Sequence, residues 1–187
     1  METRPSPTSV RTPGVLQIGR LHLLPDYLRP GLDIVFVGLN PGTRSARVGH
    51  YYAGRGNQFW SFLFEAAFTD RPLAPEEDAL ILSYNIGLTD LVKRSTPRAG
   101  DLANAEFRSD FPLLRSKIGR VRPRIVCFNG KIGYEKAVGH RYHYGLQGHQ
   151  LEGVPVFLAP STSGSLPMRR SDKLAFYREL KALTDRR

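Results

Sequence analysis

The sequence has very little cysteine. Its one cysteine, Cys127, lies in the apolar run RIVCFN, so the chain can form no internal disulfide. A single cysteine also excludes a structural zinc finger or a four-cysteine iron–sulfur cluster built within the chain. We predict that Cys127 packs as a small apolar side chain in the core.

Long apolar runs are also lacking. No run approaches the roughly 20 residues that span a bilayer, and the opening stretch METRPSPTSVRTPG has no apolar centre of the kind found in signal peptides. We therefore expect a cytoplasmic protein, associated with the nucleoid, or a nuclear one if its source is eukaryotic. Residues 1–20 are predicted to be a disordered tail, and residues 21–187 a single domain.

Acidic residues are scarce beside basic ones. The chain has 17 aspartates and glutamates against 27 lysines and arginines, which gives a net charge of +10. Such an excess favours a polyanionic partner, either nucleic acid or an anionic membrane surface. With 187 residues, 41% of them hydrophobic, the chain is long enough for one compact domain with a core and too short for two.

Short apolar runs alternate with segments of helical spacing. The predicted strands, buried on both faces, are 33–39, 124–129 and 154–160. The predicted helices are 57–68, 107–121, 131–138 and 171–183. Asn57 is the predicted N-cap of the first helix, and Pro112 must lie in a first turn or kink its helix. This alternation predicts an α/β fold with a mainly parallel sheet and a site at the carboxyl ends of its strands.

The loop after the first predicted strand is the most unusual segment of the chain. The stretch GLNPGTRSARVGHYYAGRGNQFW contains five glycines, three arginines and two adjacent tyrosines, and it is too irregular for one helix or strand. Phosphate-binding loops of the Walker type end in Gly-Lys-Ser/Thr, which this loop lacks, so an NTPase is excluded.

This loop resembles a known motif. GLNPG followed by GNQFW is similar to the first motif of the mismatch-specific uracil/thymine-DNA glycosylases, a branch of the uracil-DNA glycosylase superfamily. The resemblance continues in family order through LPDYLRPGLDIVFVGLNPG, GLTDLVKRSTPRAGDL, RPRIVCFNGK and APSTSGS, and covers residues 24–187. It implies a three-layer α/β/α sandwich and hydrolysis of the bond between a damaged or mispaired pyrimidine and deoxyribose, with no metal or organic cofactor.

The implied chemistry needs hydrogen-bond donors at the leaving base and an oriented water at C1′ of the sugar. By resemblance, Asn40 is the catalytic asparagine that positions this water; its alternative role is an Asx turn. Tyr52 lies where the family stacks an aromatic ring on the flipped base, unless Tyr51 and Tyr52 form a core pair. Leu39 and Tyr52 are further expected to contact the base through their backbones.

Two more positions match the base pocket of the family. Ser45 lies at a pocket position that varies among members. Asn129, which opens the sequence NGK, matches a recurrent position after a strand, and its alternative role is a strand-end cap.

Asp90, in GLTDLV, departs from the family pattern, in which this position is uncharged or basic. A carboxylate here can take a proton from the hydrolytic water, which an amide cannot do. We therefore assign Asp90 as a second catalytic candidate. A solvated helix N-cap is the alternative.

The loop PSTSGSLPMRR matches the second family motif, which fills the gap left by the extruded nucleotide. Its wedge and backbone-contact candidates are Ser163, Gly164, Ser165, Leu166, Met168, Arg169 and Arg170. We choose Leu166 as the wedge, against the alternative that it packs on the C-terminal helix. The two arginines are placed for DNA phosphates, although a basic pair before a solvated helix is common.

The sequence thus predicts a monofunctional DNA glycosylase that flips out and removes uracil, chiefly opposite guanine, in base excision repair. Its expected partner is double-stranded DNA with G:U or related mismatches, and single-stranded DNA as a second substrate. We expect a monomer whose product passes to an abasic-site endonuclease. No lysine matches a family nucleophile, so Schiff-base chemistry is not implied. The alternatives are a glycosylase for thymine, ethenocytosine or hypoxanthine, and a non-catalytic binder of mismatched or abasic DNA, against which Asn40 and Asp90 argue.

Overall fold

The computed structural model describes residues 16–18 and 21–185. A central five-stranded sheet has the order β4 (Ile86–Asp90), β3 (Ile34–Gly38), β5 (Ile125–Asn129), β7 (Val154–Ala159) and β6 (Gly145–Leu151). The first four strands are parallel and β6 is antiparallel to β7. The carboxyl ends of β4, β3, β5 and β7 therefore meet at one edge of the sheet.

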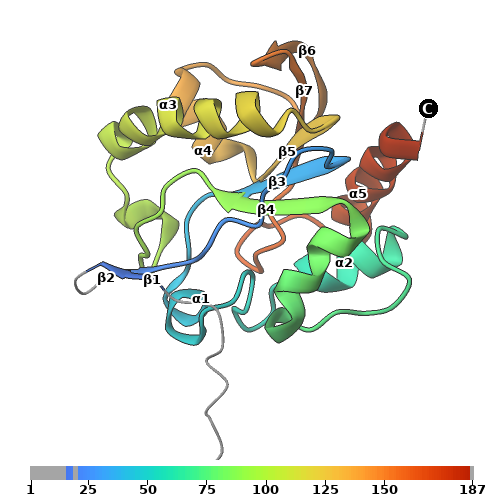
Figure 1. Cartoon of the computed structure of the whole chain (residues 1–187), viewed down its shortest axis with the longest axis horizontal. Coiled ribbons are helices and arrows are strands. Elements are labelled where there is room, and N and C mark those ends of the chain that lie inside the picture. The colour runs from blue at the N-terminus through green and yellow to red at the C-terminus, as the bar shows by residue number, and fades with distance from the viewer. Residues whose placement is uncertain (1–15, 19–20, 186–187) are drawn as a thin grey trace, which may run out of the picture.

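Helices cover both faces of this sheet (Figure 1). Helices α3 (Asn104–Val121) and α4 (Lys131–Val138) lie on one face, and α2 (Phe59–Glu65) and α5 (Arg170–Asp185) on the other. The remaining elements are α1 (Thr43–Val48), the 3-10 helices η1 (Pro75–Tyr84) and η2 (Ala99–Asp101), and a hairpin of β1 (Leu16–Ile18) and β2 (Leu21–Leu23). The predicted three-layer α/β/α sandwich is confirmed. Of the predicted disordered tail, residues 16–18 form β1 and the others lie outside the described residues.

Strand residues alternate between two cores. In β3, Ile34 and Phe36 belong to the core shared with α2 and α5, whereas Val35 and Val37 belong to the core shared with α3. This period of two is the side-chain periodicity of a strand buried on both faces. Cys127 of β5 has no exposed surface, as predicted, and burial raises the pKa of its thiol well above the ordinary value.

The helices differ from their predicted limits for local reasons. Helix α3 begins three residues before the predicted start, so Pro112 lies inside it rather than in its first turn. Helix α2 ends early, at Glu65, and Ala67 takes a left-handed backbone conformation with φ 59°. The predicted N-cap is wrong by one residue: Gln58 is the N-cap of α2, and Asn57 lies before it with its Oδ1 accepting from the Phe59 amide at 3.0 Å.

Neither the hairpin strands β1 and β2 nor two strands of the central sheet were predicted. Strand β4 has the sequence IGLTD, which contains a glycine and two polar residues and so lacks an apolar run, although the structure buries all five residues. Strand β6, GLQGHQL, is an edge strand whose five central residues are exposed or partly exposed. In both strands the sheet, rather than the local sequence, determines the conformation.

Candidate active site

A cavity of about 690 Å³ lies at the carboxyl edge of the sheet. Its wall is formed by the loops that follow β3, β4, β5 and β7. Ten of the predicted site residues line it, namely Leu39, Asn40, Ser45, Tyr52, Asp90, Asn129, Ser163, Gly164, Ser165 and Leu166. Met168, Arg169 and Arg170 do not. The structure thus brings together residues that are up to 127 positions apart in the chain, counted from Leu39 to Leu166.

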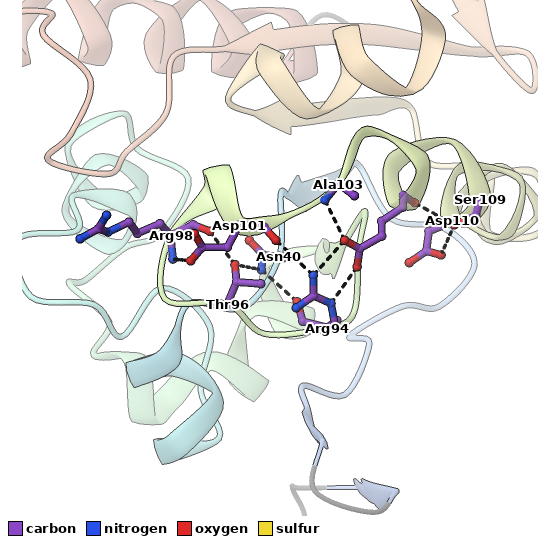
Figure 2. A network of polar contacts seen from close by, with 9 residues as sticks. Asn40, Arg94, Thr96, Arg98, Asp101, Ala103, Ser109 and Asp110 are labelled. Carbon is purple, nitrogen blue, oxygen red and sulfur yellow. Dashed lines mark hydrogen bonds and ion pairs between the residues drawn. The ribbon is translucent and has the colours of Figure 1, made fainter.

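Asn40 has a fixed orientation at the start of the loop after β3. Its Nδ2 donates to the backbone carbonyl of Arg94 at 2.9 Å and to Oγ1 of Thr96 at 2.8 Å (Figure 2). Because both amide hydrogens are used, Oδ1 is the side-chain atom left to accept a hydrogen bond. Such an oxygen is suited to hold a water.

The hydrogen-bond network that holds Asn40 extends to the start of α3, as Figure 2 shows. The Arg94 guanidinium binds both carboxylate oxygens of Glu106, at 2.7 and 2.8 Å, and Glu106 also accepts from the amide of Ala103 at 2.8 Å. These hydrogen bonds lower the pKa of Glu106 to about 2. Thr96 donates in turn to the Arg98 carbonyl at 2.8 Å. Sequence reasoning assigned no role to Arg94 or Thr96, because only the fold places them against Asn40.

Asp90 lies at the last position of β4, beside Gly38 of β3. It is 4% exposed, and its Oδ2 has no hydrogen-bond partner among the described residues. Burial raises the pKa of this carboxyl to about 6, a shift opposed by Lys93. The alternative role as a solvated helix N-cap is therefore wrong: residues 86–90 form a buried strand at the edge of the sheet, and Asp90 lines the cavity.

Tyr51 and Tyr52 have different environments. Tyr51 is a core residue, 2% exposed, whereas Tyr52 is half-buried and lines the cavity. The Tyr52 ring stacks on Phe59 with centroids 3.8 Å apart. Tyr52 also has a left-handed backbone with φ 55°, which is unfavourable for a bulky residue and persists only where the surroundings enforce it.

The peptide groups on both sides of Tyr52 are held by side chains. Before it, the Tyr51 amide donates to the buried Asp78 carboxylate at 2.9 Å. After it, the Ala53 amide donates to Oγ of Ser45 at 3.0 Å, and Nε of Arg44 donates to the Ala53 carbonyl at 2.7 Å. These contacts account for the left-handed conformation, and they give Ser45 a structural role in addition to its place on the cavity wall.

The other two predicted base-binding residues are largely engaged with the protein. The Asn129 carboxamide donates to Oγ1 of Thr162 at 2.9 Å and accepts from the Thr162 amide at 3.1 Å and the Tyr177 hydroxyl at 3.2 Å. It therefore ties the end of β5 to the loop after β7, as the capping alternative predicts. The Leu39 carbonyl accepts from the Val92 amide at 3.0 Å. Contact of either residue with a base stays a prediction.

The loop after β7 forms the opposite side of the cavity mouth. Its apex, Gly164 and Ser165, is exposed, and the hydroxyls of Ser163 and Ser165 are 2.9 Å apart. Leu166 and Met168 are both half-buried. Of these two apolar candidates, Leu166 alone lines the cavity, and its role as the wedge stays a prediction.

The cations around the mouth differ in their partners. Arg170 forms an ion pair with Glu65 and lies over the Phe62 ring at 5.1 Å. Arg169 lies 3.0 Å from Asp172. Arg55, which sequence reasoning missed, is exposed on the cavity wall and has no ion pair within the described part of the chain. Its position between two glycines, in GRG, was the available signal.

Within residues 16–18 and 21–185, no three His, Cys, Asp or Glu side chains are grouped so that they could hold a metal ion. None of the described helices is both long enough and apolar enough to cross a membrane.

Comparison with known proteins identifies the family. The model of the uracil DNA glycosylase superfamily matches residues 25–182. The fold is similar to the solution NMR structure of a candidate uracil DNA glycosylase from Methanosarcina acetivorans, with 25% sequence identity and a TM-score of 0.50. This match covers 84% of the present chain and 96% of the other. The chain therefore belongs to the uracil DNA glycosylase superfamily and is a DNA glycosylase, a hydrolase of N-glycosidic bonds.

Proposed function

We propose that this protein is a monofunctional, mismatch-specific DNA glycosylase that removes uracil, chiefly from G:U pairs. The observation that supports it most directly is the cavity floor. There the Asn40 oxygen is free to accept, and the Asp90 carboxylate is buried with one oxygen unpartnered. A binding protein without activity would need neither group.

In the proposed reaction Asn40 and Asp90 act on one water. Asn40 accepts a hydrogen bond from it and holds it at C1′ of deoxyribose, and Asp90 takes its proton. The water oxygen bonds to C1′ as the C1′–N1 bond breaks, and the electron pair of that bond leaves on the base. Backbone amides of loop 40–56 donate to the base, where negative charge develops. The departing base is an anion and becomes uracil on taking up a proton, which balances the proton that Asp90 accepted and then releases. The other product is an abasic site, the substrate of an abasic-site endonuclease.

Two further residues serve base extrusion in this proposal. The Tyr52 ring, covered on one face by Phe59, stacks on the flipped base through its other face. Such stacking contributes roughly 1–3 kcal/mol per base. Leu166 enters the duplex from the cavity mouth and fills the space that the nucleotide leaves.

The test is base release from defined oligonucleotides. End-labelled G:U, A:U and G:T duplexes and single-stranded uracil DNA are incubated with the protein, and abasic sites are then cleaved with alkali. We expect cleavage of G:U to be fastest. The Asn40→Ala, Asp90→Asn double variant, prepared in parallel, controls for contaminating glycosylase. Binding of G:U DNA without cleavage would refute the proposal in favour of a mismatch-binding protein, and preferential cleavage of another base would reassign the substrate.

A further inference from the structure

A cluster of three charged side chains lies close to the cavity and has no role in the proposed reaction. Asp26, in the segment before β3, forms ion pairs with Lys93, from the loop after β4, and with Lys117 of α3. The Thr89 hydroxyl also donates to Asp26, at 2.6 Å. The three charged side chains are only 13–25% exposed, so salt and solvent screen their charges only in part.

Lys93 lies directly behind the cavity wall. Its Nζ donates to the Tyr51 hydroxyl at 3.2 Å and to the Leu24 carbonyl at 3.4 Å, and both of these residues line the cavity. Lys93 itself does not line the cavity. It is therefore placed to act on groups of the cavity through its charge, and not by contact with a base or with DNA.

The cluster has one positive charge in excess. Burial raises the pKa of Asp26, but Lys93, Lys117 and the Thr89 hydroxyl outweigh it and hold this pKa below its ordinary value. Asp26 is therefore ionised, and two ammonium groups share its one carboxylate. Partly buried charges are stable when an opposite charge balances them. Asp90, three residues before Lys93 in the chain, supplies the second carboxylate when it is ionised.

The other titratable groups around Asp90 are neutral. Tyr51 and Tyr52, from the loop after α1, are each subject to burial and to the charge of Asp90, which hold the pKa of both hydroxyls above the ordinary value. Burial also raises the pKa of the Asp90 carboxyl, to about 6. The charged groups that act on Asp90 are Lys93, Asp26 and Lys117, and the first of these has the largest effect.

We propose that Lys93 is a positioning residue that acts through Asp90: its ammonium group, held behind the cavity wall by Asp26, keeps the buried carboxylate in the ionised form that takes the proton from water. This inference rests on the proposed function for its catalytic consequence. A nearby cation favours the ionised form of a carboxyl group, so loss of the Lys93 charge must raise the pKa of Asp90. Loss of the Asp26 charge leaves two unbalanced ammonium groups and must lower it.

The first test is Lys93→Met, which keeps an unbranched side chain and removes the charge. Uracil release is measured under single-turnover conditions from pH 4.5 to 9. We expect the acid limb of the profile to move up by about one pH unit, with a loss of about tenfold on that limb and little change at pH 9. Lys93→Arg, which keeps the charge, should retain the wild-type profile.

Asp26→Asn gives the opposite expectation. With both lysines charged and their shared partner neutral, the acid limb should move down, by up to about one pH unit. A purely structural role of the cluster would instead slow both variants alike at every pH, and that result would overturn the inference. Lys181→Met, which removes an ammonium group from an ion pair on α5, is the matched control and should leave the profile unchanged.

A second readout does not depend on activity. The Asp90 carboxyl carbon is followed by NMR through a pH titration, with its signal assigned by its absence in Asp90→Asn. The Asp90 pKa should rise by about one pH unit in Lys93→Met and fall in Asp26→Asn. If Lys93→Met does not fold, the direction of the shift in Asp26→Asn decides alone. An unchanged pKa would overturn the inference whatever the substrate proves to be. Shifts of opposite sign in a protein that releases no uracil would support the link between Lys93 and Asp90 and refute the proposed function instead.

Discussion

The floor and the mouth of the cavity differ in how their polar groups are paired. At the floor, the Tyr52 hydroxyl and one oxygen of Asp90 are buried without partners. At the mouth, Arg170 binds Glu65, Arg169 binds Asp172, and the serine hydroxyls of the loop lie against each other. The unpaired polar groups thus lie at the buried floor, where the lack of a hydrogen bond is most unfavourable. The paired groups lie at the mouth, where water could serve as their hydrogen-bond partner.

This difference indicates that the floor of the cavity lowers the stability of the fold in favour of the reaction. An unpartnered carboxylate in a buried site destabilises the fold, and such groups persist mainly at functional sites. Under the proposed function, the groups around the mouth exchange their internal partners for DNA when the duplex binds. Substitutions at the floor should therefore have larger effects on the reaction than substitutions at the mouth.

The largest expected effect is on catalysis at the floor. Asn40→Ala and Asp90→Asn should each slow uracil release from G:U duplex by about 10²- to 10⁴-fold, and the double variant should lose less than the product of the two, because both residues act on one step. Activity of the wild type should fall as the pH drops below about 6, where Asp90 becomes protonated. Single-turnover assays with DNA-binding measurements check this. Full activity in Asp90→Asn would remove the carboxylate from the mechanism.

The second expected effect is a gain in the free energy of unfolding when Asp90 is replaced by asparagine. The pKa of Asp90 is about 6 in the folded protein, against an ordinary value of 3.8 for an aspartate. A raised folded-state pKa favours the fold below pH 3.8, and this advantage is lost as the pH rises through 6. Asp90→Asn, which stays neutral, should therefore be more stable than the wild type at pH 8, by up to roughly 3 kcal/mol. Urea unfolding at pH 8 and pH 4 tests this, and the difference should shrink to less than about 1 kcal/mol at pH 4.

At the mouth, Leu166→Ala should give a smaller and graded effect. A lost wedge matters most where the base is well paired, so we expect a loss of roughly tenfold on A:U, less on G:U and almost none on single-stranded uracil. A lesion at the floor would slow all three substrates alike. Met168→Ala is the matched control, since Met168 does not line the cavity. A graded loss in Met168→Ala alone would transfer the wedge to that residue.

The smallest effect concerns charge at the mouth. If Arg55 binds a phosphate, Arg55→Ala should make the slope of log affinity against log salt shallower by about one unit, without changing the preference for G:U. Arg170→Ala should change the slope less, because Glu65 already neutralises its guanidinium. Equal slopes for Arg55→Ala and wild type would place Arg55 away from the DNA, and a larger change for Arg170→Ala would reverse the comparison.

The parts of the fold that were predictable from the sequence are those with a periodic pattern of apolar residues. The apolar runs of β3, β5 and β7 and the spacing of α3 and α5 gave the layers of the fold, since burial on two faces or one face leaves a period in the chain. Strands β4 and β6 have no such period and were missed. Consequently Asp90, at the end of β4, could be predicted as a catalytic candidate from its chemistry, but its position at the end of a buried strand could not be predicted.

The candidate site was predictable only where the motif names the residue. Asn40 and Tyr52 lie in the glycine-rich loop, and both line the cavity. Their supports could not be found in this way: Thr96 and Arg94 fix Asn40 from 54 or more residues away, and Asp78 fixes the Tyr52 turn from η1. Contacts at this separation depend on the finished fold and leave no pattern in the local sequence.

The lone cysteine in the middle of the sheet also makes the protein a reporter of its own unfolding. Cys127 is fully covered and its thiol is held in the unreactive protonated form, so a thiol reagent reaches it only when β5 separates from its neighbours. The rate of labelling therefore measures the opening of the sheet in the native protein. Because the same strand carries Asn129 at its end, that rate also measures how often the cavity wall opens and closes in the DNA-free protein.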